Sequence, residues 1–268
     1  MTRDINKARP GKSAQGAVIS GNKILLNNAI DLTGGKSWSK AGYVVSHLFE
    51  EDIFTRFEAQ TRTQLIRLWR ESGLSVPNDF QLDQYHILAS TQASHLAAVA
   101  KTKLISIANF PIPIKLMEDR IGELCNVPLM AKNPFDRQSV FHFRVVRPHS
   151  QDNNPLHRDV WLADYADCIN LYIPVAGSNE CSSLTLIPGS HHWPENKTTR
   201  TKEGAIIDGI QYNVPAVTEI REPYEIVRPN PGRNEVLVFS PYLIHGGAVN
   251  LNPAQTRISM ELRLWKKN

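Results

Sequence analysis

The run His157-Arg158-Asp159 places an imidazole and a carboxylate two residues apart, a spacing that suits the binding of a metal ion. Residues i and i+2 of a β-strand point to the same face, so a strand here would let His157 and Asp159 converge and would direct Arg158 to the opposite face. An imidazole and a carboxylate are two of the three ligands in a 2-His-1-carboxylate iron site. The pair alone often occurs by chance, so a metal role depends on a second histidine.

His245 supplies the second imidazole. It ends an apolar run and precedes Gly246-Gly247, and glycine permits a close backbone approach or an unusual turn. Arg257 follows twelve residues after His245, and Ser259 would share its face on a strand. A guanidinium offers two parallel donors to a carboxylate, so Arg257 with the Ser259 hydroxyl is a candidate receptor for a carboxylate ligand.

Four further residues near the motif are candidates for ligand contacts. Asn170 and Tyr172 lie on the strand expected after the motif, where either could line a cosubstrate pocket. Arg144 on the preceding strand and Trp161 just after the motif are candidates for substrate contacts. Their plainer interpretations are a solvated strand face for Arg144 and simple packing for Trp161.

Two other groups of polar residues have plainer roles. His191 and His192 follow the Pro188-Gly189 turn, which is typical of loop residues rather than of metal ligands. The basic residues of the run 197–202 are typical of a solvated loop.

The elements that must position these residues change character along the chain. Residues 43–45 indicate a short strand, Ser46 is a candidate cap for a helix that ends near Gly73, and helices are predicted over residues 82–103 and after Pro113. Short strands are predicted over residues 23–32, 140–146, 168–175, 183–187, 235–239 and 258–265. The order favours a helical first half covering an all-β second half, with a sandwich or barrel.

The motifs together resemble the phytanoyl-CoA hydroxylase family of Fe(II)/2-oxoglutarate-dependent oxygenases, over residues 40 to 265. The resemblance rests on the following segments: His157-Arg158-Asp159, His245 with Arg257 twelve residues on, Gly42-Tyr43-Val44-Val45, Leu186-Ile187-Pro188-Gly189-Ser190-His191 and Leu243-Ile244-His245-Gly246. It implies a double-stranded β-helix, which is a jelly roll, with N-terminal helices packed on one side.

The resemblance also implies a cofactor, a cosubstrate and a reaction. His157, Asp159 and His245 would hold Fe(II), and 2-oxoglutarate and O2 would bind the open positions. Arg257, helped by Ser259, would receive the distal carboxylate of 2-oxoglutarate. The implied reaction decarboxylates 2-oxoglutarate to succinate and CO2 and hydroxylates an unactivated C–H bond of a small metabolite. Asp159 favours hydroxylation over halogenation, because halogenating relatives lack this carboxylate; desaturation, epimerisation and cyclisation use the same three ligands.

The composition limits the class of protein, its partners and its cellular compartment. The 268 residues are 41% hydrophobic and 21% charged, which suits a globular domain with a sizeable core. The net charge of +4 is too small to indicate a nucleic-acid partner and suits an anionic small substrate better than a cationic one. The 3 cysteines show no CxxC spacing, apolar runs are too short to span a membrane, and no signal peptide is evident, so we expect a cytoplasmic protein.

We therefore predict a single oxygenase domain over residues 1–268. It would comprise a flexible arm over residues 1 to about 22, a mainly helical part over 36–135, and a jelly-roll core over 136–268 with a lid-like insertion at 193–234. Two rivals stay open: a non-catalytic jelly-roll binding module, and a zinc or manganese hydrolase or isomerase that uses the same ligands.

Overall fold

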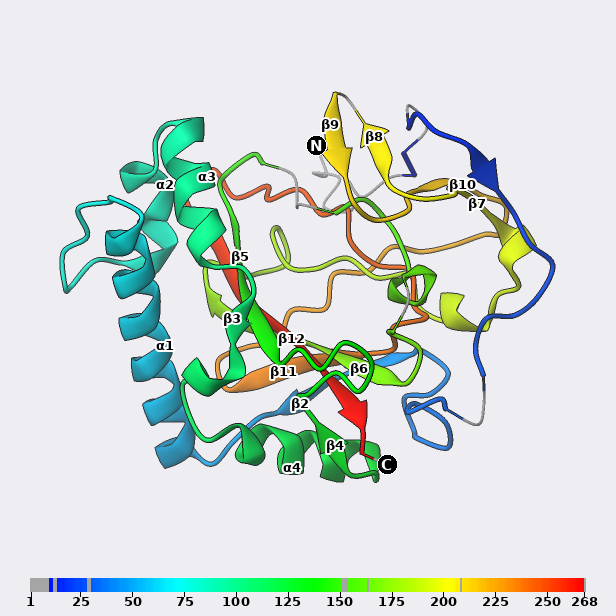
Figure 1. Ribbon diagram of the computed structural model, residues 1–268, viewed down its shortest axis with the longest axis horizontal. Coiled ribbons are helices and arrows are strands. Elements are labelled where there is room, and N and C mark those ends of the chain that lie inside the picture. Colours follow the sequence, from blue (N-terminus) through cyan, green and yellow to red (C-terminus); the bar gives the residue numbers. More distant parts are fainter. Residues whose placement is uncertain are drawn as a thin grey trace.

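The longest strands pair into one antiparallel sheet that forms the first layer of the protein. The computed structural model describes residues 10–11, 14–27, 30–150, 154–162, 164–207 and 209–267. The order of this main sheet is β2 (Tyr43–His47), β11 (Glu235–Phe239), β6 (Cys168–Ala176), β12 (Arg257–Lys266), β5 (Val140–Val146) and β3 (Ile105–Ser106), and β4 (Leu129–Met130) pairs with β12. Figure 1 shows β12 crossing the middle of the molecule between β5 and β6.

A second layer faces this sheet and is built mostly from single bridges. His157 pairs with His245, and Leu186 pairs with both His245 and Val227. Beyond Leu156, which accepts a hydrogen bond from the Val217 amide, this layer continues into a small sheet. That sheet consists of β10 (Val217–Ile220), β7 (Thr198–Thr201) and β1 (Val18–Ile19). The two antiparallel layers confirm the predicted jelly roll.

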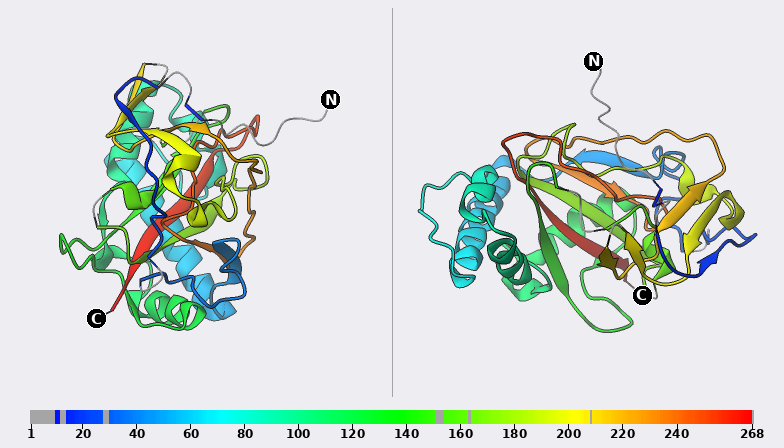
Figure 2. Two further views of the ribbon diagram at one scale, coloured as in Figure 1. Left: turned by 90° about the vertical axis from the view of Figure 1, so that its right-hand side faces the viewer. Right: turned by 90° about the horizontal axis from the view of Figure 1, so that it is seen from above.

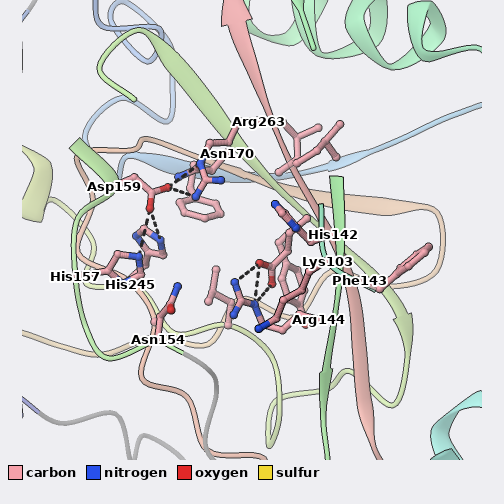
Figure 3. A pocket seen from close by; sticks show the side chains of 17 residues that line it. Lys103, His142, Phe143, Arg144, Asn154, His157, Asp159, Asn170, His245 and Arg263 are labelled. Carbon is pink, nitrogen blue, oxygen red and sulfur yellow. Dashed lines mark hydrogen bonds and ion pairs between the residues drawn. The ribbon is translucent and has the colours of Figure 1, made fainter. Parts of the chain in front are cut away.

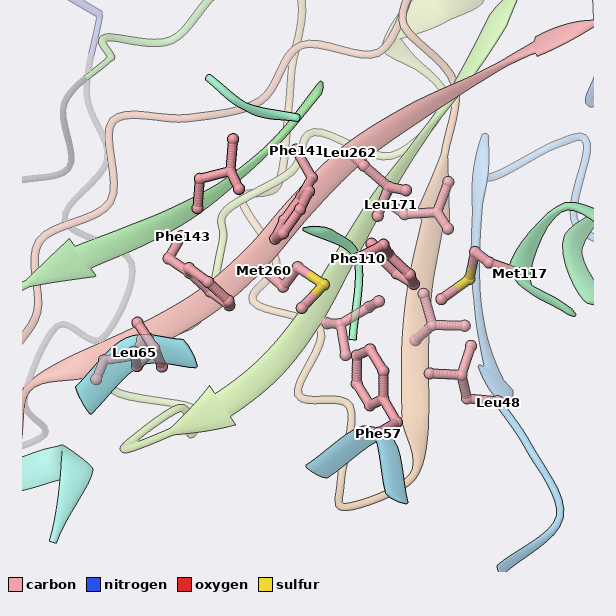
Figure 4. Packing of buried hydrophobic residues seen from close by; sticks show 14 of the residues in the cluster. Leu48, Phe57, Leu65, Phe110, Met117, Phe141, Phe143, Leu171, Met260 and Leu262 are labelled. Atoms are coloured by element: carbon pink, nitrogen blue, oxygen red, sulfur yellow. The ribbon is translucent and has the colours of Figure 1, made fainter. Parts of the chain in front are cut away.

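Helices cover the outer face of the main sheet (Figure 2). They are α1 (Glu51–Glu71), α2 (Tyr85–Leu88), α3 (Gln92–Lys101) and α4 (Ile114–Cys125), with the 3-10 turns η1 (Leu82–Gln84) and η2 (Ile107–Asn109) between them. The alternation in β5 explains the packing, since Phe141 and Phe143 face the helices while His142 and Arg144 face the second layer. Figure 4 shows these phenylalanines with Phe57 of α1 and Met117 of α4 in one apolar core.

Some predicted elements are wrong in detail. The helix expected over residues 82–103 is broken, because Ala89 leaves the helical conformation and Thr91 caps a new helix by accepting from the Ser94 amide. Ser46 lies in β2 and caps no helix; α1 begins after Glu50.

Two predicted strands do not form as regular strands. Residues 23–32 contribute only the single bridge of Ile24 among the described residues. Residues 183–187 contribute only the bridges of Leu186. Neither segment runs beside a partner for long enough to build a ladder.

The polar insertion and the arm also differ from expectation. Residues 193–234 hold β7, β10 and the hairpin of β8 (Ala205–Ile207) and β9 (Ile210–Tyr212). Residues 1–9 and 12–13 of the predicted arm lie outside the described residues, and the arm's Val18–Ile19 pairs with β7 instead of extending freely. No described helix is both long and apolar enough to cross a membrane.

Candidate functional site

The two predicted histidine ligands are direct neighbours in the second layer. His157 and His245 exchange both backbone hydrogen bonds, at 2.9 and 3.0 Å. Each follows an apolar residue, Leu156 or Ile244, and both of these join a separate buried cluster. Because strand residues alternate in direction, burying Leu156 and Ile244 on one side turns both imidazoles toward the space between the layers.

Asp159 reaches the same point by a route that the sequence did not predict. It does not continue a strand; it begins the 3-10 turn η3 (Asp159–Trp161). The Asp159 and Val160 amides donate to the Pro241 carbonyl, which fixes the turn to the chain just before His245. The expected convergence with His157 therefore arises from a turn and not from strand alternation.

The three side chains present lone pairs to one another, as a metal site requires. Nδ1 of His157 lies 2.8 Å from the Pro155 carbonyl and Nδ1 of His245 lies 2.9 Å from the Leu243 carbonyl, so both Nδ1 atoms are the protonated ones in the neutral rings. Each Nε2 then directs its lone pair into the space that it shares with Asp159 Oδ1, which lies 3.3 and 3.8 Å away.

This buried arrangement fits a cation. Oδ1 of Asp159 is buried and has no hydrogen-bond partner among the described residues. The ligand atoms of His157, Asp159 and His245 all lie within 4.8 Å of one another (Figure 3). Such a group of acceptors is costly without a positive charge, and imidazole with carboxylate is the donor set that suits Fe(II).

Arg263 holds the other carboxylate oxygen, and sequence reasoning missed it. Its Nε and Nη2 donate to Asp159 Oδ2 at 3.1 and 2.9 Å, which leaves Oδ1 directed at the histidines. The signal was present, because Arg257, Ser259, Glu261 and Arg263 follow one another at alternate positions of β12. Residues that hold a metal ligand from behind set its orientation and its affinity for the ion.

The charge states suit metal binding. Burial alone would raise the pKa of Asp159, but Arg263, followed by the histidines, holds that pKa well below its ordinary value. Burial, helped by His157, lowers the pKa of His245 to about 4, so this ring is neutral at pH 7. A charged carboxylate beside a neutral imidazole is the form that binds a metal ion.

Gly246 allows the close approach of the two ligand segments. Its φ of +98° is in the region that favours glycine, and an added Cβ would lie 2.6 Å from the Pro155 carbonyl oxygen and 3.1 Å from His157 Nδ1. The glycine predicted to permit close approach is therefore needed beside the first histidine.

The ligands open into a cavity of about 260 Å³ between the two layers. Its walls combine the inner faces of β5, β6 and β12 with the ligand segments and Lys103. Its lining side chains include Lys103, His142, Arg144, Asn154, Asn170, Tyr172, Glu261 and Arg263 (Figure 3).

The far side of the cavity carries most of the remaining charge. Arg144 Nε lies 2.9 Å from both oxygens of Glu261, across the paired strands β5 and β12. Lys103 is exposed at the rim and makes no salt bridge with a described acid. The next residue, Leu104, has a φ of +52° and donates its amide to His142 Nδ1 at 2.9 Å, so a strained turn fixes Lys103 in place.

The structure places the predicted cosubstrate residues at different depths. Asn170 lines the cavity, and its amide oxygen and nitrogen are buried without a hydrogen-bond partner among the described residues. Tyr172 also lines it, and its hydroxyl lies 2.6 Å from Ser178 Oγ.

Arg257 and Ser259 lie deeper than the cavity wall. Both are fully buried, and neither is among the described lining residues. The Arg257 guanidinium lies 5.8 Å from the Tyr172 ring and lowers the pKa of the Tyr172 hydroxyl against the larger, raising effect of burial. Ser259 donates to Glu261 at 3.2 Å.

The remaining candidates differ in whether they line the cavity. Trp161 donates to Glu195 at 3.2 Å and packs with the apolar cluster behind the ligands, so it does not wall the described cavity. Arg144, the other substrate candidate, does line it. His191 and His192 lie in the 3-10 turn η4 (Ser190–His192), where both contact the Ser39 carbonyl.

Comparison with known proteins identifies the family. Residues 41–259 match phytanoyl-CoA dioxygenase (PhyH), whereas no curated protein matches the chain.

Several solved structures resemble the chain. AviO1 from Streptomyces viridochromogenes Tue57 is 16% identical with a TM-score of 0.49, covering 90% of this chain and 96% of that one. EctD from S. alaskensis with bound Fe is 14% identical with a TM-score of 0.48, covering 97% and 88%. The α-ketoglutarate-dependent carbocyclase SnoK from nogalamycin biosynthesis is 12% identical with a TM-score of 0.46, covering 85% and 81%.

These structural similarities are weak, whereas the family match spans most of the chain and includes all three candidate ligands. The chain belongs to the phytanoyl-CoA dioxygenase (PhyH) family of Fe(II)- and 2-oxoglutarate-dependent oxygenases.

Proposed function

We propose that this protein hydroxylates an unactivated C–H bond of a small molecule while 2-oxoglutarate is decarboxylated to succinate and CO2. The observation that carries the proposal is the convergence of His157, Asp159 and His245 beside a cavity. Arg263 leaves one carboxylate oxygen free to complete this triad. When bound, Fe(II) with 2-oxoglutarate supplies the oxidising chemistry with O2, and the protein supplies binding, orientation and a dry site.

The chain's own residues have separate roles in this proposal. His157, Asp159 and His245 hold Fe(II) on one face, which leaves room for the cosubstrate. Asn170 directs an unpaired amide into the cavity, which supports a hydrogen bond to 2-oxoglutarate or substrate. Tyr172 with Arg257 behind it supports the binding of the distal carboxylate of 2-oxoglutarate, and Ser259 lies on the same strand as Arg257.

The charges of the cavity favour an anionic substrate. Asp159 offsets Arg263, and Glu261 offsets Arg144, so Lys103 remains as a surplus cation at the rim. Bound Fe(II) and the dianionic cosubstrate would carry charges of about +2 and −2, which offset each other, so the surplus positive charge remains. We propose that Lys103 and Arg144 face an acidic group of the substrate, while Trp161, which packs behind the ligands, makes no direct contact.

The setting is part of the proposal. Cys125, Cys168 and Cys181 are all free thiols, which supports a reducing compartment such as the cytoplasm.

Anaerobic titration tests the iron site. Fe(II) plus 2-oxoglutarate should produce a weak visible charge-transfer band in the wild type and none in His157→Ala. Absence of the band in the wild type would favour the non-catalytic binding module.

Turnover tests the reaction. Succinate release should require O2, and a metabolite screen read by mass should show a gain of one oxygen. Turnover that ignores O2 would favour a hydrolase or isomerase, and a loss of two hydrogens would indicate desaturation or cyclisation.

A further inference from the structure

Arg158 lies between two candidate ligands and points away from them into the protein. Its side chain is completely buried, and its Nη2 donates to the Ser190 carbonyl at 2.9 Å. A buried guanidinium is costly unless its contacts do something for the fold or the site. This contact ties the segment that carries His157 and Asp159 to the turn η4.

The same serine reaches the segment that carries the third ligand. Ser190 is fully buried, and its Oγ accepts a hydrogen bond of 2.9 Å from the Ile244 amide. Ile244 directly precedes His245. One residue therefore accepts a donor adjacent to each histidine, through its carbonyl on one side and its hydroxyl on the other.

Glu195 supplies the countercharge for this arrangement. It lies at the start of the turn η5 (Glu195–Lys197), and its carboxylate is 3.7 Å from Arg158 Nη1 and 3.4 Å from Arg200 Nε. It also accepts the Trp161 indole N–H from the turn that Asp159 begins. The insertion at 193–234 thus meets the ligand turn from behind, and none of the described cavity-lining residues comes from it.

We infer that Arg158, Ser190 and Glu195 form a brace that holds the two ligand segments at the spacing the metal requires. This inference rests on the proposed metal site. The brace positions the ligands and does not touch the substrate. It makes the predicted insertion a rear support of the metal site rather than a lid over the cavity.

The physical reason for a brace lies in the weakness of the local pairing. His157 and His245 meet in an isolated bridge, without a continuous ladder on either side. Small displacements of a ligand lower metal affinity, and partners that orient ligands typically change affinity by about 10- to 100-fold. Contacts at both ends of Ser190 limit sliding of one ligand segment against the other.

Two variants test the brace. Ser190→Ala removes the hydroxyl and leaves the rest of the turn. The double variant Arg158→Met with Glu195→Gln removes both charges of the buried pair and leaves Arg200, which is only partly buried, as the remaining cation. We expect Fe(II) affinity, measured by chelator competition, to fall by about 10- to 100-fold in both. The affinity for 2-oxoglutarate at saturating Fe(II) should stay within about twofold, because the brace lies on the side of the ligands away from the cavity.

A matched control and a spectroscopic readout separate positioning from general stability. Arg120→Met removes a guanidinium that donates to the His47 and Leu48 carbonyls, far along the chain from the ligands. It should leave metal affinity unchanged. Co(II) bound by the brace variants should show shifted absorption bands, and Arg158→Lys should recover part of the lost affinity.

Two outcomes would overturn the inference. The first is wild-type Fe(II) affinity and an unchanged Co(II) spectrum in folded Ser190→Ala. The second is an equal loss of 2-oxoglutarate affinity, which would mean that the whole cavity was disturbed. If the wild type binds Co(II) but gives no Fe(II)/2-oxoglutarate band, the proposed function is wrong. The Co(II) spectra and affinities of the variants would still test whether the brace positions the ligands.

Discussion

The two layers of the jelly roll differ in how they are held together. In the main sheet, β12 pairs along most of its length with both β5 and β6, over a core that reaches the helices. In the second layer the ligand segments meet in single bridges. Continuous ladders and apolar burial therefore maintain the fold, while a few specific contacts maintain the geometry of the site.

A charged contact nevertheless links the two layers. Arg263 projects from the main sheet and binds Asp159, which belongs to the opposite layer. The regular main sheet therefore fixes the position of a ligand in the irregular second layer. Variants in each layer should separate the role of the main sheet in stability from the role of the second layer in metal binding. The expected effects range from abolished Fe(II) binding to a small change in substrate affinity.

The largest effect is expected from the ligands. His157→Ala and His245→Ala should abolish Fe(II) binding and turnover, because two ligands cannot hold the ion against water and chelators. Both variants should still fold, as shown by circular dichroism and melting, since the apolar neighbours Leu156 and Ile244 keep the layer buried. Retained iron binding in either variant would contradict the assigned triad.

The main sheet should give the opposite pattern. Phe141 is fully buried and stacks edge-on with Phe110 and Phe143 at 5.3 and 5.5 Å. Phe141→Ala should lower the free energy of unfolding by about 3 to 5 kcal/mol, measured by denaturant titration. The folded fraction should bind Fe(II) normally, and a parallel loss of affinity would break the division between the layers.

Acid should weaken the protein in part through His191, which is packed beside the second layer. Burial lowers the pKa of His191 to about 4 from an ordinary 6.5, so the unfolded chain binds a proton that the folded chain does not between these values. The contribution of His191 to the free energy of unfolding is therefore fully present above pH 6.5 and is lost as the pH falls toward 4. The expected loss from this residue is up to about 3 kcal/mol. Denaturant titrations from pH 4 to 7 should show a shallower slope for His191→Gln.

The contact between the layers should affect the metal more than the fold. Arg263→Met should lower Fe(II) affinity by about 10- to 100-fold, because Asp159 loses the partner that directs Oδ1 to the ion. Chelator competition measures this loss. The exposed Arg233→Met, which removes ion pairs to Glu51 and Glu58, serves as the control and should leave the affinity unchanged.

The smallest effect is expected at the rim of the cavity. Lys103→Met should raise the KM for an anionic substrate roughly fivefold, which corresponds to about 1 kcal/mol for one charge-assisted contact. The KM for 2-oxoglutarate should change less. The reverse result would assign Lys103 to the cosubstrate and remove the argument for an acidic substrate.

The local residue pattern predicts an element correctly where neighbouring residues alone determine its secondary structure. The alternation of residues 140–146 predicts β5, and the apolar spacing after Pro113 predicts α4. The break at Ala89 was missed because the apolar spacing on each side of it continues. The strand over residues 183–187 failed because an apolar run does not show how many partners lie beside it.

The sequence by itself determined which residue types are available for the site. His157, Asp159, His245 and Arg257 stand in an order and at a spacing that resemble the family, and this resemblance implies iron with 2-oxoglutarate. Tertiary structure decided how they are held. Asp159 reaches the histidines through a turn fixed by Pro241. Arg263 acts on it from a strand distant in sequence, and Arg158 binds Ser190 of a turn that is also distant in sequence. These contacts depend on how separate segments pack, which residue spacing along one chain does not encode.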